Sequence, residues 1–320
     1  MSVSAFLEKH FRHFNARETL AAAQAYKKHT AEGGKILLAM AGAMSTAELG
    51  ISLAQMIRAG HVHAISCTAA NLEEDIFNLV AHDEYKIVSN YRDLSPQGEL
   101  ALRDDGFNRV TDTCIPETAM RHLERYLLEY WVEAGEAGVS RDANEYFFRL
   151  FDENKLEPYY QIPPEESWVL AAHEMRLPVF TPGFEDSTLG NIFAARVIDG
   201  TVKSHSVIKN GTAQMETLVR WYLDESPNAP IGFFQIGGGI AGDFAICAVP
   251  LIIQDLRKDV PLWSYFAQIS DSTTSYGSYS GAVPNEKITW FKLAETGPKF
   301  MINSDASIVA PLIFAYVLGQ

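Results

Sequence analysis

Two apolar runs separated by a helical segment constrain the fold of this chain more than any other feature of its sequence. Residues 35–41 and residues 63–68 each have the composition of a buried strand. Between them, Ser45 and Thr46 can cap a helix that continues to about Arg58. A strand, a helix and a second strand in this order are typical of a βαβ unit, whose two strands are parallel. This part of the chain therefore predicts an α/β fold with a parallel sheet.

Later apolar segments extend the predicted sheet. Strand patterns follow at residues 177–182, 231–236, 263–269 and 300–303. We expect residues 1–34 and the middle of the chain, residues 116–176, to be mainly helical. No linker rich in proline, glycine or serine divides the chain. We therefore expect one domain, residues 1–320, built on a mostly parallel, Rossmann-like open sheet with flanking helices and a helical N-terminal and middle region.

The overall charge and the few cysteines argue against several classes of protein. The net charge of the 320 residues is −14, whereas a nucleic-acid-binding protein normally presents a basic surface. The three cysteines are far apart, so we expect no disulfide framework, and the histidines and carboxylates do not form a metal-binding pattern. The N-terminus lacks the features of a signal peptide, and no apolar run is long enough to span a membrane. We therefore expect a cytoplasmic protein that binds neither nucleic acid nor a membrane.

Small or hydroxyl-bearing residues follow the predicted strands, at Gly42, Thr68, Gly237, Ser270 and Ser304. In open α/β sheets, ligands bind outside the carboxyl ends of the strands. The run of glycines at residues 237–239 could let the backbone approach a phosphate at the start of a helix. Its spacing differs from the dinucleotide-binding fingerprint, and a tight turn that needs positive φ explains the glycines equally well.

Several acidic residues allow both a functional and a structural interpretation. Glu73, Glu74 and Asp75 could hold amines or ribose hydroxyls. Acids at a helix start, favoured by the helix dipole, are the more common explanation of such a run. Asp271 and Asp305 could contact the ribose of a cofactor, and helix capping explains them equally well.

The most chemically specific segment lies near the C-terminus. Trp290 and Phe291 precede Lys292 there, and Glu286 lies six residues before the lysine. A lysine in an apolar setting can lose its proton near neutral pH, because desolvation disfavours the ammonium. The neutral amine is a nucleophile that forms imines. Taken alone, the segment is more simply interpreted as an amphipathic helix with a solvated lysine.

Taken in order, several motifs make the chain similar to the deoxyhypusine synthase family. The matching segments are residues 45–46, 68–75, 106–109, 177–180, 186–190, 236–239, 280–292 and 305–307. The lysine segment, S-G-A-x-P-x-E-x-I-x-W-x-K, and the D-A-S block at its C-terminal side are specific as a pair. The resemblance covers about residues 35 to 317.

This resemblance implies an enzyme that uses NAD to move a 4-aminobutyl group from spermidine to an acceptor amine. In the family, hydride leaves a carbon next to an amine, the resulting imine passes to a lysine, and the retained NADH reduces the new imine on the acceptor. The acceptor is a lysine of a translation-factor precursor in deoxyhypusine synthase and putrescine in the related homospermidine synthases. The resemblance also implies a homotetramer with sites shared between subunits.

By position, Lys292 resembles the imine-forming lysine of the family. The resemblance assigns the amine substrate to Glu73, Glu74, Asp243, Gly277, Ser278, Tyr279, Glu286 and Trp290. It assigns NAD to Ser45, Thr46, Thr68, Ala69, Ala70, Glu74, Asp186, Gly238, Asp271, Ser272, Ser280, Asp305 and Ala306. Because Glu286 and Trp290 are four residues apart, we expect them on one face of a helix, as walls of the amine site.

The chain departs from the family pattern around the substrate. Asp243 stands where the family has a histidine, Tyr276 and Tyr279 stand where it has aspartates, and Asn191 replaces a further aspartate. Removing a carboxylate from a buried ammonium costs on the order of several kcal/mol. We therefore expect an altered amine or a different acceptor, with a small amine favoured over a protein lysine. Two alternatives stay open: a non-catalytic NAD- or polyamine-binding protein, and an α/β enzyme that binds a phosphate-bearing substrate at residues 237–239.

Overall fold

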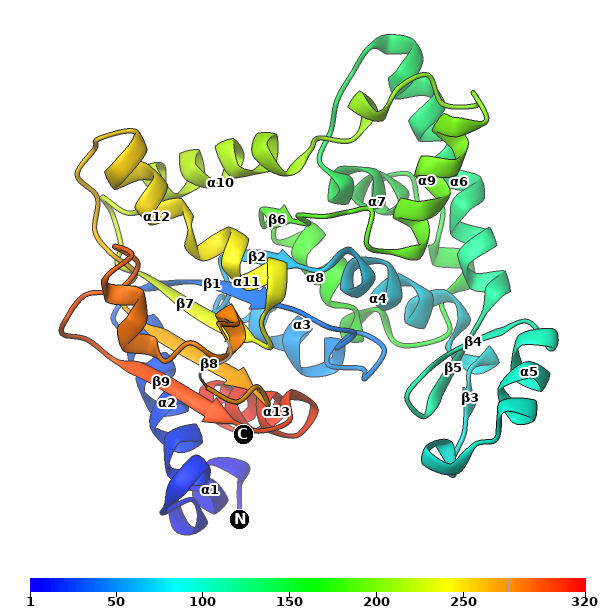
Figure 1. Cartoon of the computed structure of the whole chain (residues 1–320). Helices are drawn as coiled ribbons and strands as arrows, with labels where there is room; N and C mark the ends of the chain where they lie inside the picture. The colour runs from blue at the N-terminus through cyan, green and yellow to red at the C-terminus, as the bar shows by residue number, and fades with distance from the viewer. Residues whose placement is uncertain (275–276) are drawn as a thin grey trace.

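A six-stranded parallel sheet forms the centre of the structure, a computed structural model that describes residues 1–274 and 277–320 (Figure 1). Its strands are β1 (Lys35–Met40), β2 (Ala64–Cys67), β6 (Val179–Phe180), β7 (Ile231–Ile236), β8 (Phe266–Ser270) and β9 (Lys299–Asn303). They lie in the order β6-β2-β1-β7-β8-β9, and each neighbouring pair is parallel. The order therefore reverses between β1 and β7. This arrangement confirms the predicted open, Rossmann-like sheet.

Helices cover both faces of this sheet (Figure 1). One face packs against α2 (Phe14–Ala31), α3 (Gly50–Arg58) and α13 (Ala306–Leu318). The other face packs against α10 (Gly211–Glu225), α11 (Gly239–Ile246) and α12 (Ala248–Pro250). In β1, Leu38 and Met40 enter the first core, while Leu37 and Ala39 enter the second. Because β1, β2, β7 and β8 are buried on both faces, their sequences are nearly continuous apolar runs.

A second group of helices extends the first core beyond the edge of the sheet at β6. It consists of α4 (Ala69–Ala81), α6 (Glu117–Ala137), α7 (Ala143–Asp152), α8 (Trp168–Glu174) and α9 (Thr188–Ile198). Side chains of these helices belong to the same hydrophobic cluster as α2 and α3. The helical middle of the chain is thus confirmed, as is the helical N-terminal segment, in which α1 (Val3–His10) precedes α2.

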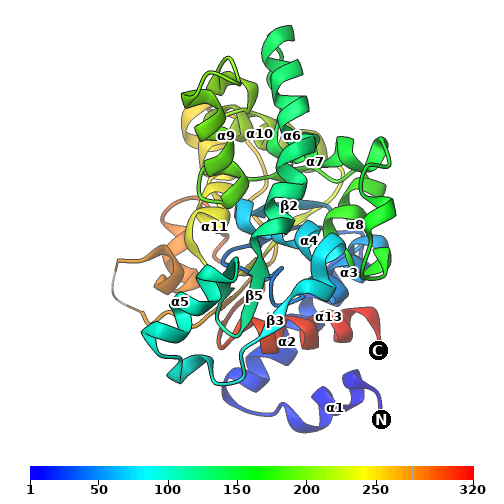
Figure 2. The same ribbon diagram turned by 90° about the vertical axis from the view of Figure 1, so that its right-hand side faces the viewer.

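A small antiparallel sheet was not predicted from the sequence. Its strands β3 (Lys86–Ile87), β5 (Thr113–Pro116) and β4 (Phe107–Val110) lie in that order, next to α5 (Pro96–Asp104). Figure 1 draws it to the right of the other elements, and Figure 2 shows β5 leading directly into the long helix α6. Its strands have two to four residues, and neither β3 nor β4 has a buried side chain, so they leave no regular apolar pattern.

Two helix starts differ from the prediction. Helix α3 begins at Gly50 rather than beside Ser45 and Thr46, because Glu48 has a left-handed φ of 55° that an α-helix cannot contain. Helix α4 begins at Ala69, so its run of acids lies beyond the first turn. In the part of the chain that the structure describes, no helix is both long and apolar enough to cross a membrane.

Candidate functional site

The carboxyl ends of β1 and β7 lie where the strand order reverses, which is where open α/β sheets bind ligands. Gly237 and Gly239 follow β7 with φ angles of 73° and 60°, a conformation that favours glycine. Gly238 has an ordinary φ of −147°, but a Cβ there would lie 1.6 Å from Ser280 Oγ. The three glycines therefore form a tight turn that another segment of the chain covers at close range.

That covering segment contains the turn η7 (Tyr279–Gly281), and two buried glutamines attach it to the sheet. Tyr279 Oη donates a hydrogen bond of 2.7 Å to Gln235 in β7. Gln268 in β8 donates one of 2.9 Å to the carbonyl of Ser280. The backbone N–H of Gly239 donates one of 3.3 Å to Ser280 Oγ. These bonds hold the predicted substrate and cofactor segments against each other at the strand ends.

Lys292 lies inside this arrangement rather than on the surface. The residue is only 8 % exposed. Its ammonium donates a hydrogen bond of 3.2 Å to Asp243 Oδ1, from α11. The same nitrogen lies 5.3 Å from the centre of the Tyr279 ring and 5.9 Å from that of Trp290. The solvated-lysine interpretation is therefore wrong, and Asp243 supplies the lysine with a carboxylate partner.

Lys287 is a second buried lysine at the same place, and the sequence analysis missed it. It is 2 % exposed, and its amine donates a 3.1 Å hydrogen bond to the carbonyl of Ala282. The amine lies 4.8 Å from the ring centre of Tyr279 and 5.1 Å from that of Phe266. Burial, reinforced by the nearby charge of Lys292, lowers the pKa of Lys287 to about 8. Lysine is usually exposed, and a short turn has no hydrophobic periodicity, so the sequence pattern could not predict that Lys287 is buried.

Both lysines line a cavity of about 750 Å³, which we call the lysine pocket. Its walls include Asp243, Gly277, Ser278, Tyr279, Glu286 and Trp290, together with Lys287 and Lys292. The structure thus brings together all the predicted substrate residues except Glu73 and Glu74. Tyr276 lies outside the described residues. Burial also raises the pKa of the Tyr279 hydroxyl, so it stays protonated and uncharged here.

The expected helix carrying Glu286 and Trp290 is absent. A short 3₁₀-helix, η8 (Pro284–Ile288), contains Glu286, whose carboxylate accepts a 3.1 Å hydrogen bond from the N–H of Val283. Trp290 follows this turn and is 64 % exposed. Phe291 has a left-handed φ of 56°, which prevents the helix from continuing. Both side chains still border the lysine pocket, one at each side of the turn.

The acids of α4 stabilise other helices instead of their own. The Glu73 carboxylate accepts hydrogen bonds of 2.8 and 2.7 Å from the N–H groups of Thr188 and Leu189, at the start of α9. Asp75 accepts from the N–H groups of Trp168 and Val169 at the start of α8. The helix-start interpretation is therefore wrong in detail, because these carboxylates satisfy N-termini that lie far along the chain. Both carboxylate oxygens of Glu73 bind the start of α9, and Glu73 does not line the lysine pocket.

Glu74 and Thr46 lie at the carboxyl edge of the sheet, and each has a buried oxygen that makes no hydrogen bond of ordinary geometry among the described residues. The atoms are Glu74 Oε2 and Thr46 Oγ1. Burial raises the pKa of Glu74 to about 7. The neighbouring Ser45 differs, because its hydroxyl donates to the carbonyl of Asn71 and accepts from the indole of Trp168. Thr46 contacts the Glu74 carboxyl through its side chain and N–H, which lowers the pKa of Glu74 against the effect of burial. Ser45 is thus satisfied by the protein, whereas this weaker contact leaves Glu74 and Thr46 capacity for a ligand.

Most other predicted cofactor positions follow strands at the same edge. They are Thr68, Ala69 and Ala70 after β2, Gly238 after β7, Asp271 and Ser272 after β8, and Asp305 and Ala306 after β9. Asp305 caps α13 with a 2.8 Å bond from the N–H of Ser307, and Thr68 caps α4. Asp271 precedes no helix, so capping does not explain it. Asp186 lies on the loop before α9, where it borders a separate shallow pocket.

This edge has features that fit a dinucleotide. The strand order reverses there, where open α/β sheets bind ligands, and Gly239 of the glycine turn is exposed at this point. The buried oxygens of Thr46 and Glu74 could bind ribose or amide groups. Within residues 1–274 and 277–320, no group of three or more histidine, cysteine or acidic side chains could hold a metal ion.

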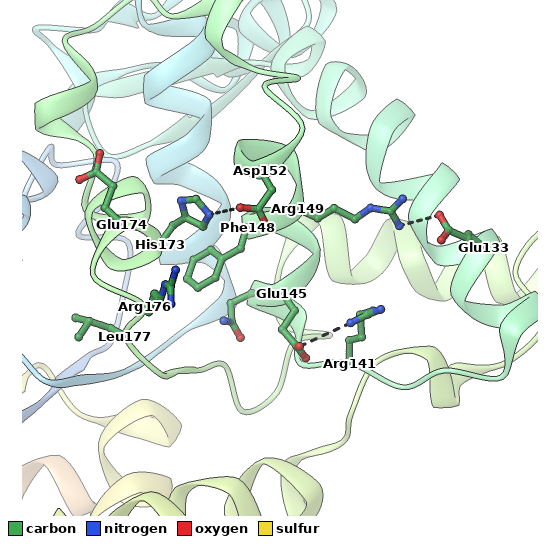
Figure 3. A pocket seen from close by; sticks show the side chains of 11 residues that line it. Glu133, Arg141, Glu145, Phe148, Arg149, Asp152, His173, Glu174, Arg176 and Leu177 are labelled. Carbon is green, nitrogen blue, oxygen red and sulfur yellow. Dashed lines mark hydrogen bonds and ion pairs between the residues drawn. The ribbon is translucent and has the colours of Figure 1, made fainter.

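A second cavity of about 750 Å³ lies elsewhere, between α6, α7 and α8 (Figure 3). Its charged side chains pair with one another: Arg149 with Glu133 at 2.7 Å and His173 with Asp152 at 2.8 Å. Figure 3 shows these pairs along its walls. It contains none of the predicted site residues, so we do not assign the chemistry to it.

Comparisons with known proteins identify the family of the chain. The family model for deoxyhypusine synthase matches residues 7–317. A deoxyhypusine synthase-like protein of Cyanothece sp. is 28% identical over 294 residues, which cover 90% of this chain and 72% of that protein. A protein of the same name from Thermosynechococcus vestitus is 27% identical over 331 residues, covering 100% of this chain and 79% of that protein. A solved deoxyhypusine synthase homologue from Entamoeba histolytica superposes with a TM-score of 0.58 at 12% identity, covering 100% of this chain and 94% of that one.

Proposed function

Because the chain belongs to the deoxyhypusine synthase family, we propose that it transfers an aminoalkyl group from an amine donor to an acceptor amine through an imine on Lys292. The observation that carries this proposal is the buried amine of Lys292 in a cavity beside the switch point of the sheet. A lysine that forms imines must be shielded from water and within reach of the substrate carbon.

NAD is the hydride carrier in this proposal. When bound, it takes hydride from the carbon next to the donor nitrogen and returns hydride to the product imine. The residues that would hold it are those of the carboxyl edge: the glycine turn, Thr46, Glu74, and Asp271 with Asp305. The buried oxygens of Thr46 and Glu74 support this role.

The remaining side chains of the lysine pocket would bind and orient the amine. Asp243 and Glu286 supply carboxylates for cationic groups, and the faces of Tyr279 and Trp290 supply aromatic contact. Asp243 also accepts a hydrogen bond from Lys292, so it can keep that amine directed into the cavity.

We propose a small amine, as in homospermidine synthases, rather than a protein lysine as the acceptor. The charged walls of the pocket are Asp243, Glu286, Lys287 and Lys292, whose formal charges cancel. Such a pocket offers less compensation to a polycation than one lined by carboxylates alone. A donor or acceptor with few ammonium groups therefore fits it better than unmodified spermidine and a basic protein segment.

The experiment is incubation with NAD and a panel of amines, followed by borohydride reduction and peptide mass spectrometry. We expect an adduct on Lys292 with at least one donor, and none in Lys292→Ala. Putrescine and a lysine-containing translation-factor precursor are then compared as acceptors. Thermal stabilisation by NAD without any adduct would instead support a non-catalytic binding protein. If NAD does not bind, the whole proposal fails.

We also propose that the chain forms a homotetramer, as the family resemblance implies. Apolar side chains beside the pocket support an interface there: Val283, Trp290 and Phe291 are 40%, 64% and 47% exposed. Light scattering coupled to size-exclusion chromatography tests this, and a monomer at micromolar concentration would contradict it.

A further inference from the structure

Lys287 is a buried amine for which the proposed reaction so far has no use. Burying a lysine is costly unless its charge is compensated or given up. Lys287 has no carboxylate within ion-pair distance among the described residues, and its amine donates to a neutral carbonyl, that of Ala282. Its position between the rings of Phe266 and Tyr279 removes most of the remaining water. If this position served only to pack the core, an apolar side chain would stabilise the fold more than a lysine.

The backbone directs Lys287 and Lys292 to the same place. The N–H of Lys292 donates a 3.0 Å hydrogen bond to the carbonyl of Lys287, closing a turn that spans residues 287–292. Both side chains then run to the ring of Tyr279, with their nitrogens 4.8 and 5.3 Å from its centre. The two amines therefore share one cavity and one aromatic wall.

The charges around Lys287 come from three elements. Lys292 lies on the turn after η8 and Asp243 on α11, while Glu286 is its neighbour on η8. Tyr279 on η7 faces it as an uncharged phenol. Lys292 lowers the pKa of Lys287 and the two carboxylates raise it, but burial is the largest effect and the pKa falls to about 8. Two ammonium groups at once are thus disfavoured in this cavity.

We propose that Lys287 and Lys292 act as a pair that shares one proton, so that Lys287 holds the ammonium while Lys292 reacts as the free amine. This inference rests on the proposed function, in which Lys292 forms the imine. Lys287 does not react with the substrate itself. It is a positioning residue that holds the proton while Lys292 reacts.

The ammonium of Lys292 gives one proton to the amine of Lys287, and the free amine of Lys292 then adds to the carbon of the donor iminium ion. The C–N bond to the departing amine breaks, and that amine leaves with the electron pair of the bond. The departing nitrogen takes one proton from Lys287, which restores that neutral amine, and a second proton from the Lys292 nitrogen of the adduct. The amine therefore leaves as an ammonium ion, and Lys292 remains as a protonated imine. No oxidant or further reactant is needed for these steps.

The test uses butanal and cyanoborohydride on the full chain from pH 6 to 10, with the label on each lysine quantified by mass spectrometry. Lys287→Met keeps the length of the side chain but removes its charge. We expect labelling of Lys292 at pH 7.5 to fall by about tenfold in this variant, with its midpoint moved up by about one pH unit. Lys287→Arg keeps a positive charge in place, so it should retain labelling within about threefold of the original protein.

Lys299→Met is the matched control, because Lys299 also donates to backbone carbonyls but lies outside the lysine pocket. It should leave the Lys292 profile unchanged. A Lys287→Met profile that coincides with the original would overturn the proposal, since a purely structural lysine is replaced adequately by methionine. Labelling of Lys287 in preference to Lys292 would also overturn it, because Lys287 would then be the nucleophile.

A second measurement needs no variant. Reductive ¹³C-methylation of the original protein allows both amines to be titrated by NMR. We expect both signals to move in the same first step, and independent titrations would refute the shared proton. Butanal requires neither NAD nor the natural amine. A positive result here with no adduct from any natural amine would therefore overturn only the proposed function.

Discussion

Replacing Gly238 with alanine tests how tightly the glycine turn and the covering segment are packed. The backbone of Gly238, at φ −147° and ψ −134°, is not in the left-handed region. The obstacle is steric: the new Cβ would lie 1.6 Å from Ser280 Oγ and 2.5 Å from Ser280 Cβ. Rotating the hydroxyl cannot relieve the second contact, so the segment carrying Ser280 must move by about 1 Å to restore ordinary packing distances.

That movement has a calculable cost. It weakens the bonds of Ser280 to Gly239 (3.3 Å) and to Gln268 (2.9 Å), each worth about 1 kcal/mol. Overpacking adds about 1–3 kcal/mol. We therefore expect Gly238→Ala to lower the free energy of unfolding by about 3 kcal/mol. Removing the opposing side chain with Ser280→Gly leaves only Ser280 Cα, 3.2 Å away, so the double variant should recover about 2 kcal/mol of this loss.

Urea unfolding of the original protein, both single variants and the double variant measures the coupling. Gly211→Ala is the control, because a Cβ there meets no atom within 4 Å, and it should change stability by less than about 0.5 kcal/mol. Additive effects of the two substitutions, within about 0.5 kcal/mol, would show that Gly238 and Ser280 do not oppose each other.

Three further predictions concern buried titratable groups. Burial raises the pKa of Glu73 to about 7, so Glu73 stabilises the fold at low pH, and this stability is lost as the pH rises from about 4.3 to 7. In urea unfolding at pH 5 and pH 8, Glu73→Gln should reduce the difference in unfolding free energy between the two pH values by up to about 3 kcal/mol. Burial lowers the pKa of His63 to about 4, so its contribution to stability is present above pH 6.5 and is lost as the pH falls towards 4. His63→Gln should reduce this acid-induced loss of unfolding free energy by about 2 kcal/mol. A loss between pH 6.5 and 4 that is the same in the variant would contradict the lowered pKa. Asp75→Asn should lower the free energy of unfolding by about 2 kcal/mol, because it removes a charged acceptor for Ser167 and for the first N–H groups of α8. Asp271→Asn, at an exposed position, is the control and should change the free energy of unfolding by less than about 0.5 kcal/mol. Chemical denaturation measures both.

The centre of the sheet was predictable from the sequence because β1, β7 and β8 are buried on both faces and leave nearly continuous apolar runs. The small antiparallel sheet could not be predicted in this way, since strands such as β3, with two exposed residues, bury too little to leave a pattern. Helix α3 starts late for a similar local reason: the left-handed conformation of Glu48 has no signature in its residue type.

The candidate site was predictable in its residue types but not in their contacts. Lys292 and Asp243 are 49 residues apart, and only the packing of α11 against η7 and η8 makes them an ion pair. Lys287 was missed because burial in a turn depends on Phe266 and Tyr279, which come from other elements. Periodicity carries no information about such contacts.

The two carboxylates of α4 that bind the starts of α8 and α9 have a consequence for local opening of the structure. The first amides of a helix usually exchange with solvent by fraying, without wider unfolding. Here Val169 and Leu189 donate to side chains of a buried helix that itself packs beside the sheet. Their deuterium exchange should therefore be as slow as that of α4 itself, so that three helices distant in sequence open as one cooperative unit.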